Sequence, residues 1–401
     1  MGLKEDLTVR AVENSMGLGR PKAFKVYREL PNKKLIIPRF FKESNEPVSE
    51  GAAASIVFKA TLRPHQKEAL KAFKGNGVLC LPCGQGKTLT AIAIASTLKR
   101  KTLIIVHKEF LAAQWIERIK QFTECTTIGR IQGGTWNTDS EFTIAMIQTL
   151  CTREFAEDAF DIFGTVIIDE AHHIGAPAFS QVMLRMKPKY TLGLSATPER
   201  KDGLTKILYW FLGPAFYTMS SDSNDFSVNK IDFDYPVLFR EGPHLNRFGK
   251  ICMSTMVTEL TIIPERNAMI IEHIKDAQKR GRKSLVLSDR RGHCEYLYSQ
   301  LDPKLTNLYM GGYKGHPEIG GGTLISTFSL AYEGLDIPEL DTLFLTTPHS
   351  DVKQAVGRIT RSKGTTREIW DIVDNWSIFK QMWYKRKLIY EPPPDTQCLF
   401  S

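Results

Sequence analysis

The 401-residue sequence contains no apolar run that approaches the ~18 residues of a membrane-spanning helix. Its first ten residues, MGLKEDLTVR, are charged and lack the apolar core of a signal peptide. Cysteine is scarce, and the seven cysteines are scattered, which argues against a disulfide framework. Cys80 and Cys83 form one C-x-x-C pair, but no second pair lies nearby to complete a zinc site. We therefore expect a soluble intracellular protein, cytoplasmic or nuclear, with no membrane contact.

The composition has no acidic excess and no bias that would indicate disorder. Hydrophobic residues make up 42% and charged residues 24% of the chain, as in ordinary globular proteins. The length is sufficient for two or three domains with their own cores. The formal charge of +9 and the isoelectric point near 9.0 favour a polyanionic partner such as nucleic acid.

The stretch from Val78 to Thr88, VLCLPCGQGKT, predicts a phosphate-binding loop. A short apolar strand gives way to a glycine loop, and the apolar spacing of a helix follows. In such a loop the backbone N–H groups turn toward an anion, and the helix N-terminus adds positive partial charge. The common pattern has a glycine five residues before Gly86, where this chain has Leu81. We expect Lys87 to reach the β- and γ-phosphates of a nucleotide and Thr88 to ligate Mg²⁺.

Four further apolar runs in the first half of the chain read as buried strands that end in polar residues. These runs are Thr102–Val106, Phe142–Met146, Thr165–Asp169 and Tyr190–Ser195. This pattern is typical of a parallel sheet with its site at the carboxyl ends of the strands. Asp169 can hold Mg²⁺ through water, and Glu170 can deprotonate the attacking water. Upstream of the glycine loop, the amide of Gln66 offers the donor and acceptor needed to read adenine.

The second half of the chain repeats the alternation of strands and helices but has no phosphate loop. Its expected strands are residues 283–288, 305–310, 323–327, 342–346 and 368–373. One complete and one degenerate nucleotide fold suggest a nucleotide bound in the cleft between them. The polar stretch 220–229, SSDSNDFSVN, is the expected linker. We predict an accessory domain at 1–58, an ATP-binding domain at 59–222 and a second domain at 223–401.

Two arginines of the second half, Arg358 and Arg361, stand three residues apart and share one face of a predicted helix. Their guanidinium groups are planar, stay charged and bind oxygens in pairs, which suits the γ-phosphate of a nucleotide. Gly334 and Asp336 lie in a loop after an expected strand. We expect this loop to contact the nucleotide and to couple it to a bound strand.

Two segments allow more than one interpretation. Residues 1–58 are basic with one β-like run, so they form either a small accessory domain or a module that grips nucleic acid or docks a partner. The tail from Trp376 to Tyr390 interleaves aromatic and basic residues, which suits single-stranded nucleic acid. Its apolar residues also fall at helical spacing, which indicates packing against the second domain.

Eight stretches in chain order resemble the motifs of superfamily 2 helicases. They are LRPHQ, PCGQGKT, VHK, IQT, DEAHH, SAT, EGLD and QAVGRITR, and they span Leu62 to Arg361. IIDEAHHIGAPAF and GLSATPERKDGL resemble the XPB-like branch, which includes phage and large-DNA-virus helicases such as the poxvirus transcript-release helicase. The resemblance implies an α/β fold of two tandem RecA-like parallel-sheet domains with a small β-containing N-terminal accessory domain. It also implies ATP and Mg²⁺ as cofactors.

The resemblance assigns roles to residues of this chain by their motifs. It assigns adenine recognition to Arg63 and Gln66, and phosphate binding to Cys83, Gly84, Gln85, Gly86, Lys87 and Thr88. It gives Mg²⁺ binding to Thr88 and Asp169, general-base catalysis to Glu170, and coupling to His172, Ser195 and Thr197. The second domain would complete the nucleotide site with Gly334, Asp336, Gln354, Arg358 and Arg361. Contacts to the nucleic-acid backbone, largely indifferent to base sequence, would come from His107, Lys108, Thr149, Ser288, Arg290 and Thr327.

These expectations describe an ATP-dependent DNA helicase or translocase that moves 3′ to 5′ on single-stranded or forked DNA. ATP would close the two domains, and hydrolysis would reopen them. Three alternatives stay open: an RNA helicase, a duplex translocase that releases transcripts as a termination factor would, and a scaffold with a vestigial ATPase. The intact Lys87, Glu170 and Arg361 argue against the scaffold.

The expected partners extend beyond nucleic acid. Transcription or replication machinery is a candidate protein partner, and a viral member of the family would act in the virion or at the replication site. The oligomeric state is open, with a monomer expected.

Overall fold

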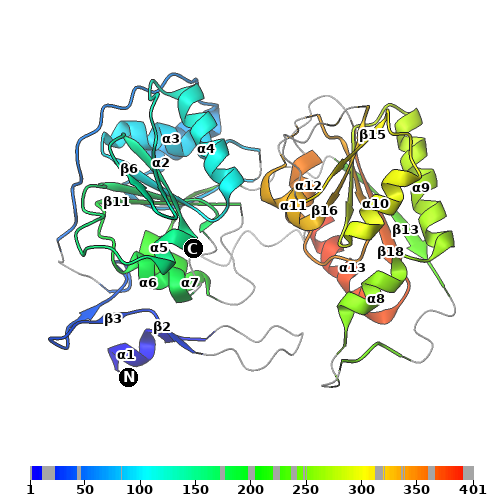
Figure 1. The fold of residues 1–401 in the computed structure, drawn as a ribbon, viewed down its shortest axis with the longest axis horizontal. Helices are drawn as coiled ribbons and strands as arrows, with labels where there is room; N and C mark the ends of the chain where they lie inside the picture. The colour runs from blue at the N-terminus through cyan, green and yellow to red at the C-terminus, as the bar shows by residue number, and fades with distance from the viewer. Residues whose placement is uncertain are drawn as a thin grey trace. The chain divides into compact units, whose positions relative to one another are not determined.

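Two α/β units make up the chain, Met1–Ser220 and Ser221–Ser401 (Figure 1). The computed structural model describes residues 2–10, 23–42, 47–82, 84–171, 177–196, 204–219, 226–235, 242–246, 249, 251–311, 319, 321–335, 337, 339–359 and 366–391. Each unit has its own parallel sheet, so the predicted α/β fold with two parallel-sheet domains is confirmed.

The first unit is built on an eight-stranded sheet with the strand order β12-β5-β11-β10-β6-β9-β7-β8. All neighbouring strands are parallel except β7 and β8. The strands are β5 (Asn76–Cys80), β6 (Thr102–Val106), β7 (Gly129–Gln132), β8 (Thr135–Asn137), β9 (Phe142–Met146), β10 (Thr165–Ile168), β11 (Tyr190–Ser195) and β12 (Ala215–Thr218). Every run expected to be a strand in this half is one. The sequence did not reveal β7, β8 and β12, which are short edge or near-edge strands.

Helices cover both faces of this sheet (Figure 1). On one face lie α2 (Pro64–Ala72), α3 (Lys87–Leu98) and α4 (Glu109–Phe122), and on the other lie α5 (Ile147–Thr152), α6 (Pro177–Met183) and α7 (Thr205–Leu212). Burial on both faces explains why β6 and β10 read as continuous apolar runs rather than as alternating patterns.

The N-terminal segment packs onto the face of the first unit that carries α6. It contains α1 (Leu3–Asp6) and two antiparallel ribbons, β1 (Thr8–Val9) with β2 (Phe24–Lys25), and β3 (Arg28–Glu29) with β4 (Leu35–Ile36). Gln181 of α6 donates from Nε2 to the carbonyl of Lys25 at 2.9 Å. Arg39 donates to the carbonyl of Pro188 at 2.9 Å. The segment is therefore a small β-containing addition held to the first unit by backbone carbonyls.

The second unit has a six-stranded, fully parallel sheet with the order β13-β18-β17-β14-β16-β15. Its strands are β13 (Phe226–Phe233), β14 (Ser284–Ser288), β15 (Thr306–Tyr309), β16 (Thr323–Thr327), β17 (Thr342–Leu345) and β18 (Arg367–Asp374). Its helices are α8 (Met253–Leu260), α9 (Pro264–Lys279), α10 (Arg291–Ser299), α11 (Phe328–Gly334), α12 (Lys353–Ile359) and α13 (Ser377–Tyr390). One face is packed by α9 and α10 and the other by α11 and α12, while α8 packs against α13.

Strand β13 corrects the expected linker. The polar stretch 220–229 was predicted to connect the domains, but a strand begins at Phe226 and pairs with β18 along its whole length. The linker prediction was therefore wrong for residues 226–229. The reason is that β13 is an edge strand with alternating, partly exposed positions, so polar residues fit into it.

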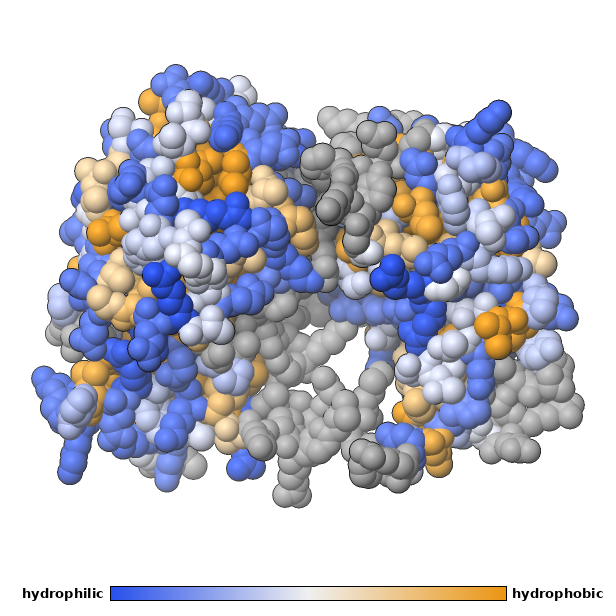
Figure 2. All heavy atoms as spheres, viewed as in Figure 1, coloured by the Kyte–Doolittle hydropathy of each residue, from blue (hydrophilic) through white to orange (hydrophobic). Residues whose placement is uncertain are grey.

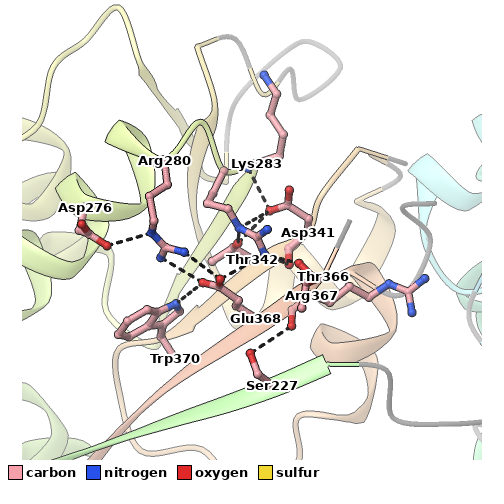
Figure 3. Close-up of polar contacts among 11 residues, drawn as sticks. Ser227, Asp276, Arg280, Lys283, Asp341, Thr342, Thr366, Arg367, Glu368 and Trp370 are labelled. Atoms are coloured by element: carbon pink, nitrogen blue, oxygen red, sulfur yellow. Dashed lines mark hydrogen bonds and ion pairs between the residues drawn. The ribbon is translucent and has the colours of Figure 1, made fainter. Parts of the chain in front are cut away.

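Charged side chains tie the amino end of β18 to α9 (Figure 3). Arg280 donates to both carboxylate oxygens of Glu368, at 2.8 and 3.0 Å. The indole N–H of Trp370 donates to the same carboxylate at 3.1 Å. Burial acts to raise the pKa of Glu368, but these donors outweigh it, and the pKa is lowered. This network lies at the edge of the sheet opposite to the carboxyl ends of the strands.

The surface is largely hydrophilic in the view of Figure 2, and apolar side chains form small, separate patches. Large apolar side chains that are exposed include Ile262, Tyr384 and Leu388. Within the described ranges, no helix has the length and apolar character needed to span a bilayer.

A buried ion pair joins α13 to β18. Arg386 is 1% exposed and donates to the two oxygens of Asp371 at 2.8 and 2.7 Å. Tyr390, one turn further along, donates its hydroxyl to Asp371 at 2.9 Å. Burial acts to lower the pKa of Arg386, but the Asp371 charge prevails and raises it. With Phe379 also buried, these contacts favour the packing interpretation of the tail.

We expect Arg386→Met to lower the free energy of unfolding by about 3–5 kcal/mol, because it leaves the Asp371 carboxylate buried without its cation. Urea unfolding, followed by circular dichroism, measures this loss. The double variant Arg386→Met/Asp371→Asn should recover much of it, because no buried charge remains. Lys385→Met, at the exposed neighbouring position, is the matched control. Equal effects of Arg386→Met and the control would contradict the assignment.

Candidate nucleotide and nucleic-acid site

The carboxyl ends of the central strands of the first sheet bring the predicted nucleotide residues to one edge. Strand β11 lies between β5, which leads into the glycine loop, and β10, which leads to Asp169. The ladder continues past the strand ends, since the N–H of Leu81 donates to the carbonyl of Ser195 at 3.2 Å. The N–H of Asp169 likewise donates to the carbonyl of Ile105 at 3.1 Å. Ser195, predicted to couple hydrolysis to movement, is fully buried between the two groups.

The glycine loop turns sharply into α3. Gly84 and Gly86 have φ angles of +79° and +78°, in the left-handed region that glycine tolerates best. Lys87 and Thr88 are the first residues of α3, which packs against β10 and β11. The Lys87 ammonium donates to the carbonyl of Leu81 at 2.9 Å, so its side chain folds back over the loop.

The first turn of α2 supports this loop from behind. Gln66 is 1% exposed, and its Nε2 donates to the carbonyls of Gln85 and Gly86 at 3.4 and 3.3 Å. Its Oε1 accepts the N–H of Arg63 at 2.8 Å, while the Arg63 side chain is exposed. His65 also donates from Nε2 to the carbonyl of Gln85, at 3.0 Å. A Cβ at Gly86 would clash with Gln66 Nε2, and the left-handed backbone of Gly86 also favours glycine.

The acidic pair follows β10 in a constrained turn. Asp169 Oδ2 accepts the indole N–H of Trp115 at 2.9 Å, and Oδ1 accepts the N–H of Glu170 at 3.0 Å. Glu170 has a φ of +49°, which is uncommon for a residue other than glycine. Such backbone geometry persists where the surroundings enforce it, as they do at functional turns.

The donor set at this edge fits a magnesium-bound nucleotide. Mg²⁺ takes oxygen ligands and is commonly held by one or two carboxylates together with waters and phosphates. Each carboxylate oxygen of Asp169 accepts one hydrogen bond and keeps a further lone pair. Thr88 supplies a hydroxyl at the start of α3, and Lys87 supplies a cation for the phosphates.

The thiol below the loop is not poised for redox chemistry. Burial raises the pKa of Cys80 to about 11, and the Thr218 hydrogen bond and the Lys87 charge offset this only in part. The thiol is therefore protonated at neutral pH, and the thiol form is the unreactive one.

The predicted nucleic-acid contacts of the first unit belong to the same edge. His107 and Lys108 follow β6, and Lys108 is the N-cap residue of α4. Thr149 lies on α5 after β9, with a buried side chain whose hydroxyl accepts the N–H of Gly133 at 2.9 Å. Gln148 donates from Nε2 to the carbonyl of His107 at 2.7 Å and so joins the two groups.

In the second unit, Ser288 ends β14 with its side chain fully buried. Its Oγ lies 3.0 Å from His293 Nδ1 and accepts the N–H of Arg290 at 3.1 Å. His293 Nε2 lies 3.0 Å from Asn267 Oδ1. Burial lowers the pKa of His293 to about 3, with a smaller effect of the Arg266 charge, so the ring is neutral. The Ser288 hydroxyl therefore points into the core and supports the backbone of Arg290.

Two further predicted contacts to nucleic acid lie at the carboxyl ends of β14 and β16. The guanidinium of Arg290 donates to Thr258 Oγ1 at 2.9 Å and to the carbonyl of Ser254 at 2.7 Å, both on α8. Thr327 is the N-cap residue of α11, with its hydroxyl 3.3 Å from that of Ser329. Both predicted residues are half-buried.

Arg358 of α12 braces the end of α11. It is 8% exposed and donates to the carbonyls of Leu335 and Tyr332, both at 2.7 Å. Gly334 is the last residue of α11, and Gln354 lies one turn before Arg358 on α12. Five predicted residues lie outside the described part of the chain: Cys83, His172, Thr197, Asp336 and Arg361.

Sequence reasoning did not assign roles to His65, Trp115, Gln148 or His293. His65 and Gln148 stand inside the recognised motifs LRPHQ and IQT, and that position is the only signal they carry. Trp115 falls on the apolar face of a helix, where a core role is the default interpretation. Its partnership with Asp169 depends on the fold and has no signature in the sequence.

Residues 59–200 match the family described as type III restriction enzyme, res subunit. A protein of Acanthamoeba polyphaga mimivirus, named putative ATP-dependent RNA helicase L396, is 34% identical over 383 residues, which cover 90% of this chain and 72% of that protein. The DNA 3′-5′ translocase XPB2 of Sulfurisphaera tokodaii is 34% identical over 211 residues, or 51% of this chain and 47% of that protein.

The fold is also similar to a solved structure. The crystal structure of the Pyrococcus furiosus Hef helicase domain aligns with a TM-score of 0.53 and 15% identity, over 81% of this chain and 98% of that one. With the phosphate loop and the acidic pair at one edge of a parallel sheet, these similarities show that the chain is a nucleic-acid-dependent ATPase and a member of the superfamily 2 helicases, on the branch of XPB-like and large-DNA-virus proteins.

Proposed function

We propose that this chain is a DNA helicase or translocase that moves 3′ to 5′ along one strand. The observation that carries the proposal is the shared edge of the first sheet. There the glycine loop, Asp169 and Glu170 lie in the same ladder of strands as His107 and Thr149. Because the nucleotide site and the strand contacts lie on one sheet, a small shift of the backbone at one of them would displace the other.

The nucleotide chemistry is assigned to residues of this chain as follows. Lys87 binds the phosphates, Thr88 and Asp169 hold Mg²⁺, and Glu170 orients and deprotonates the attacking water. Bound Mg²⁺ neutralises charge on the phosphates. Gln66 keeps the glycine loop in place beside the adenine.

The second unit contributes its arginines to this chemistry in our proposal. Arg361 stabilises the charge that develops at the γ-phosphate. Arg358 has a different task, because it donates to the carbonyls of Tyr332 and Leu335 and so holds the end of α11, where Gly334 lies. We place the ATP-binding domain at 59–222, the second domain at 223–401 and the accessory domain at 1–58.

An RNA helicase is the second candidate. The observation that favours it is the mimivirus relative, which matches 90% of this chain and is named an RNA helicase. The relative named a DNA translocase matches 51% of this chain and favours DNA. Contacts that track the phosphate backbone do not distinguish the two sugars, so only contacts to the 2′-hydroxyl would decide.

The first test is steady-state ATPase activity without nucleic acid and with single-stranded DNA, duplex DNA, forked DNA or RNA, at two salt concentrations. We expect single-stranded and forked DNA to stimulate turnover, and stimulation to weaken with salt because phosphate contacts release counterions. Stimulation by RNA alone would replace the proposal with the RNA helicase. Stimulation by duplex DNA without strand displacement would indicate a translocase.

Lys87→Ala should abolish ATP turnover, because the loop loses the cation that reaches the phosphates. Strand binding without nucleotide should persist, because the proposed strand contacts follow β6 and β9, whereas this ammonium belongs to the loop after β5. Fluorescence anisotropy of a labelled oligonucleotide measures strand binding. Lys71→Ala, on the exposed side of α2, should behave as the unchanged chain does. Normal turnover of Lys87→Ala would refute the assignment of the nucleotide site.

Substitution of Arg361 and of Arg358 should have different effects on ATP turnover and on stability. Arg361→Ala should lower kcat by about 10³-fold or more with little change in the KM for ATP, as loss of a charge-stabilising arginine does. Arg358→Ala should also lower the free energy of unfolding, by about 1–3 kcal/mol, because the carbonyls of Leu335 and Tyr332 lose their donor. Kinetics and thermal unfolding of both variants test this. A loss of ATP affinity equal to the loss of turnover in Arg361→Ala would rule out the assigned role.

A further inference from the structure

Helix α4 connects two groups at this edge of the first sheet, the proposed strand contacts His107 and Lys108 and the carboxylate assigned to Mg²⁺. It begins after Lys108, its N-cap residue, at the carboxyl end of β6. Trp115 lies seven residues further on, which is two turns or about 10 Å along the helix axis. There its indole donates to Asp169.

The beginning of α4 is fixed to the sheet by side chains. Glu109, in the first turn, accepts a hydrogen bond from Gln132 of β7 at 2.6 Å and pairs with Arg130. The bond from Arg130 lowers the pKa of Glu109, which therefore is ionised at neutral pH. Next to it, Gln148 holds the carbonyl of His107. A strand bound by His107 and Lys108 would therefore contact a hydrogen-bonded network that includes the first turn of α4.

The far end of this connection is the Asp169 carboxylate. The indole N–H can only donate, so it fixes Oδ2 as an acceptor at 2.9 Å. The N–H of Glu170 fixes Oδ1 from the other side. Trp115 is 1% exposed and lies in the apolar cluster between α3, α4 and the sheet, which leaves the ring little freedom to turn. The carboxylate orientation thus follows the position of α4.

We propose that Trp115 is a positioning residue that holds Asp169 in the orientation that binds the Mg²⁺ of the nucleotide and transmits strand binding to it through α4. The inference rests on the proposed roles of Asp169 and of the edge around His107 and Lys108. Its physical basis is that hydrogen bonds behind a metal ligand set its orientation, and their loss commonly lowers metal affinity or activity by about 10–100-fold. A helix transmits displacement because its backbone hydrogen bonds make it stiff.

Trp115→Phe removes the donor and keeps an aromatic ring in the cluster. The matched control is Trp370→Phe, which removes an indole–carboxylate bond of the same kind, to Glu368 at 3.1 Å, in the second unit (Figure 3). The primary readout is the binding of a fluorescent, slowly hydrolysed ATP analogue over a range of Mg²⁺ concentrations, with EDTA as the metal-free reference.

We expect Trp115→Phe to need about 10–100-fold more Mg²⁺ for half-maximal binding, with unchanged affinity in EDTA. Trp370→Phe should match the unchanged chain. The ratio of kcat with and without single-stranded DNA should fall toward one in Trp115→Phe only, while DNA binding without nucleotide stays the same. An unchanged Mg²⁺ requirement, or the same shift in Trp370→Phe, would overturn the positioning role.

Glu109→Gln tests transmission without altering the core, because its side chain is exposed. It weakens the hold on the first turn of α4 and leaves the indole in place. We expect a smaller stimulation by DNA and an unchanged Mg²⁺ requirement, and unchanged stimulation would refute transmission through α4. Failure of the proposed nucleotide site and failure of this inference give different results. ATP turnover by Lys87→Ala would refute the nucleotide site itself. If Lys87→Ala is inactive but Trp115→Phe has a normal Mg²⁺ requirement, only this inference is refuted.

Discussion

The parallel hydrogen-bond ladder through β5, β11, β10, β6 and β9 is the constraint on which the site of the first unit depends. Parallel pairing places the carboxyl ends of these strands at one edge of the sheet. The loops that follow them, from distant parts of the sequence, therefore begin side by side. The ladder extends one residue beyond the strands at Leu81 and Asp169, which fixes the first backbone atoms of both the glycine loop and the acidic turn. The sheet therefore positions the backbone of the site, and the side chains determine its chemistry.

Close packing then explains details that a motif alone leaves unexplained. Leu81 stands where the common phosphate loop has glycine, and its side chain is fully buried in the core below the loop. Its backbone is nevertheless used twice, by Ser195 and by the Lys87 ammonium. Gly86 is needed for a different reason, because Gln66 Nε2 occupies the space that a Cβ would fill.

Buried polar groups organise the second unit in the same way. Ser288, His293 and Asn267 form a chain that ends at the backbone of Arg290, and Arg358 binds the carbonyls at the end of α11. Such groups remain in a core only when their hydrogen bonds are satisfied. Any effect of these groups on function is therefore indirect, since they hold the backbone beside residues that we propose as ligand contacts.

The sequence by itself determined the α/β class, the two parallel sheets and most strand positions, because apolar runs are local patterns. It also predicted residues for the nucleotide chemistry, because a glycine loop is a local pattern too. It misjudged β13, whose edge position lets polar residues form a strand. Only the tertiary structure decided which side chains turn inward, as Ser288 does, and which distant groups meet, as Trp115 and Asp169 do. These contacts depend on how the helices pack on the sheet, and this packing cannot be predicted from the spacing of residues along one segment.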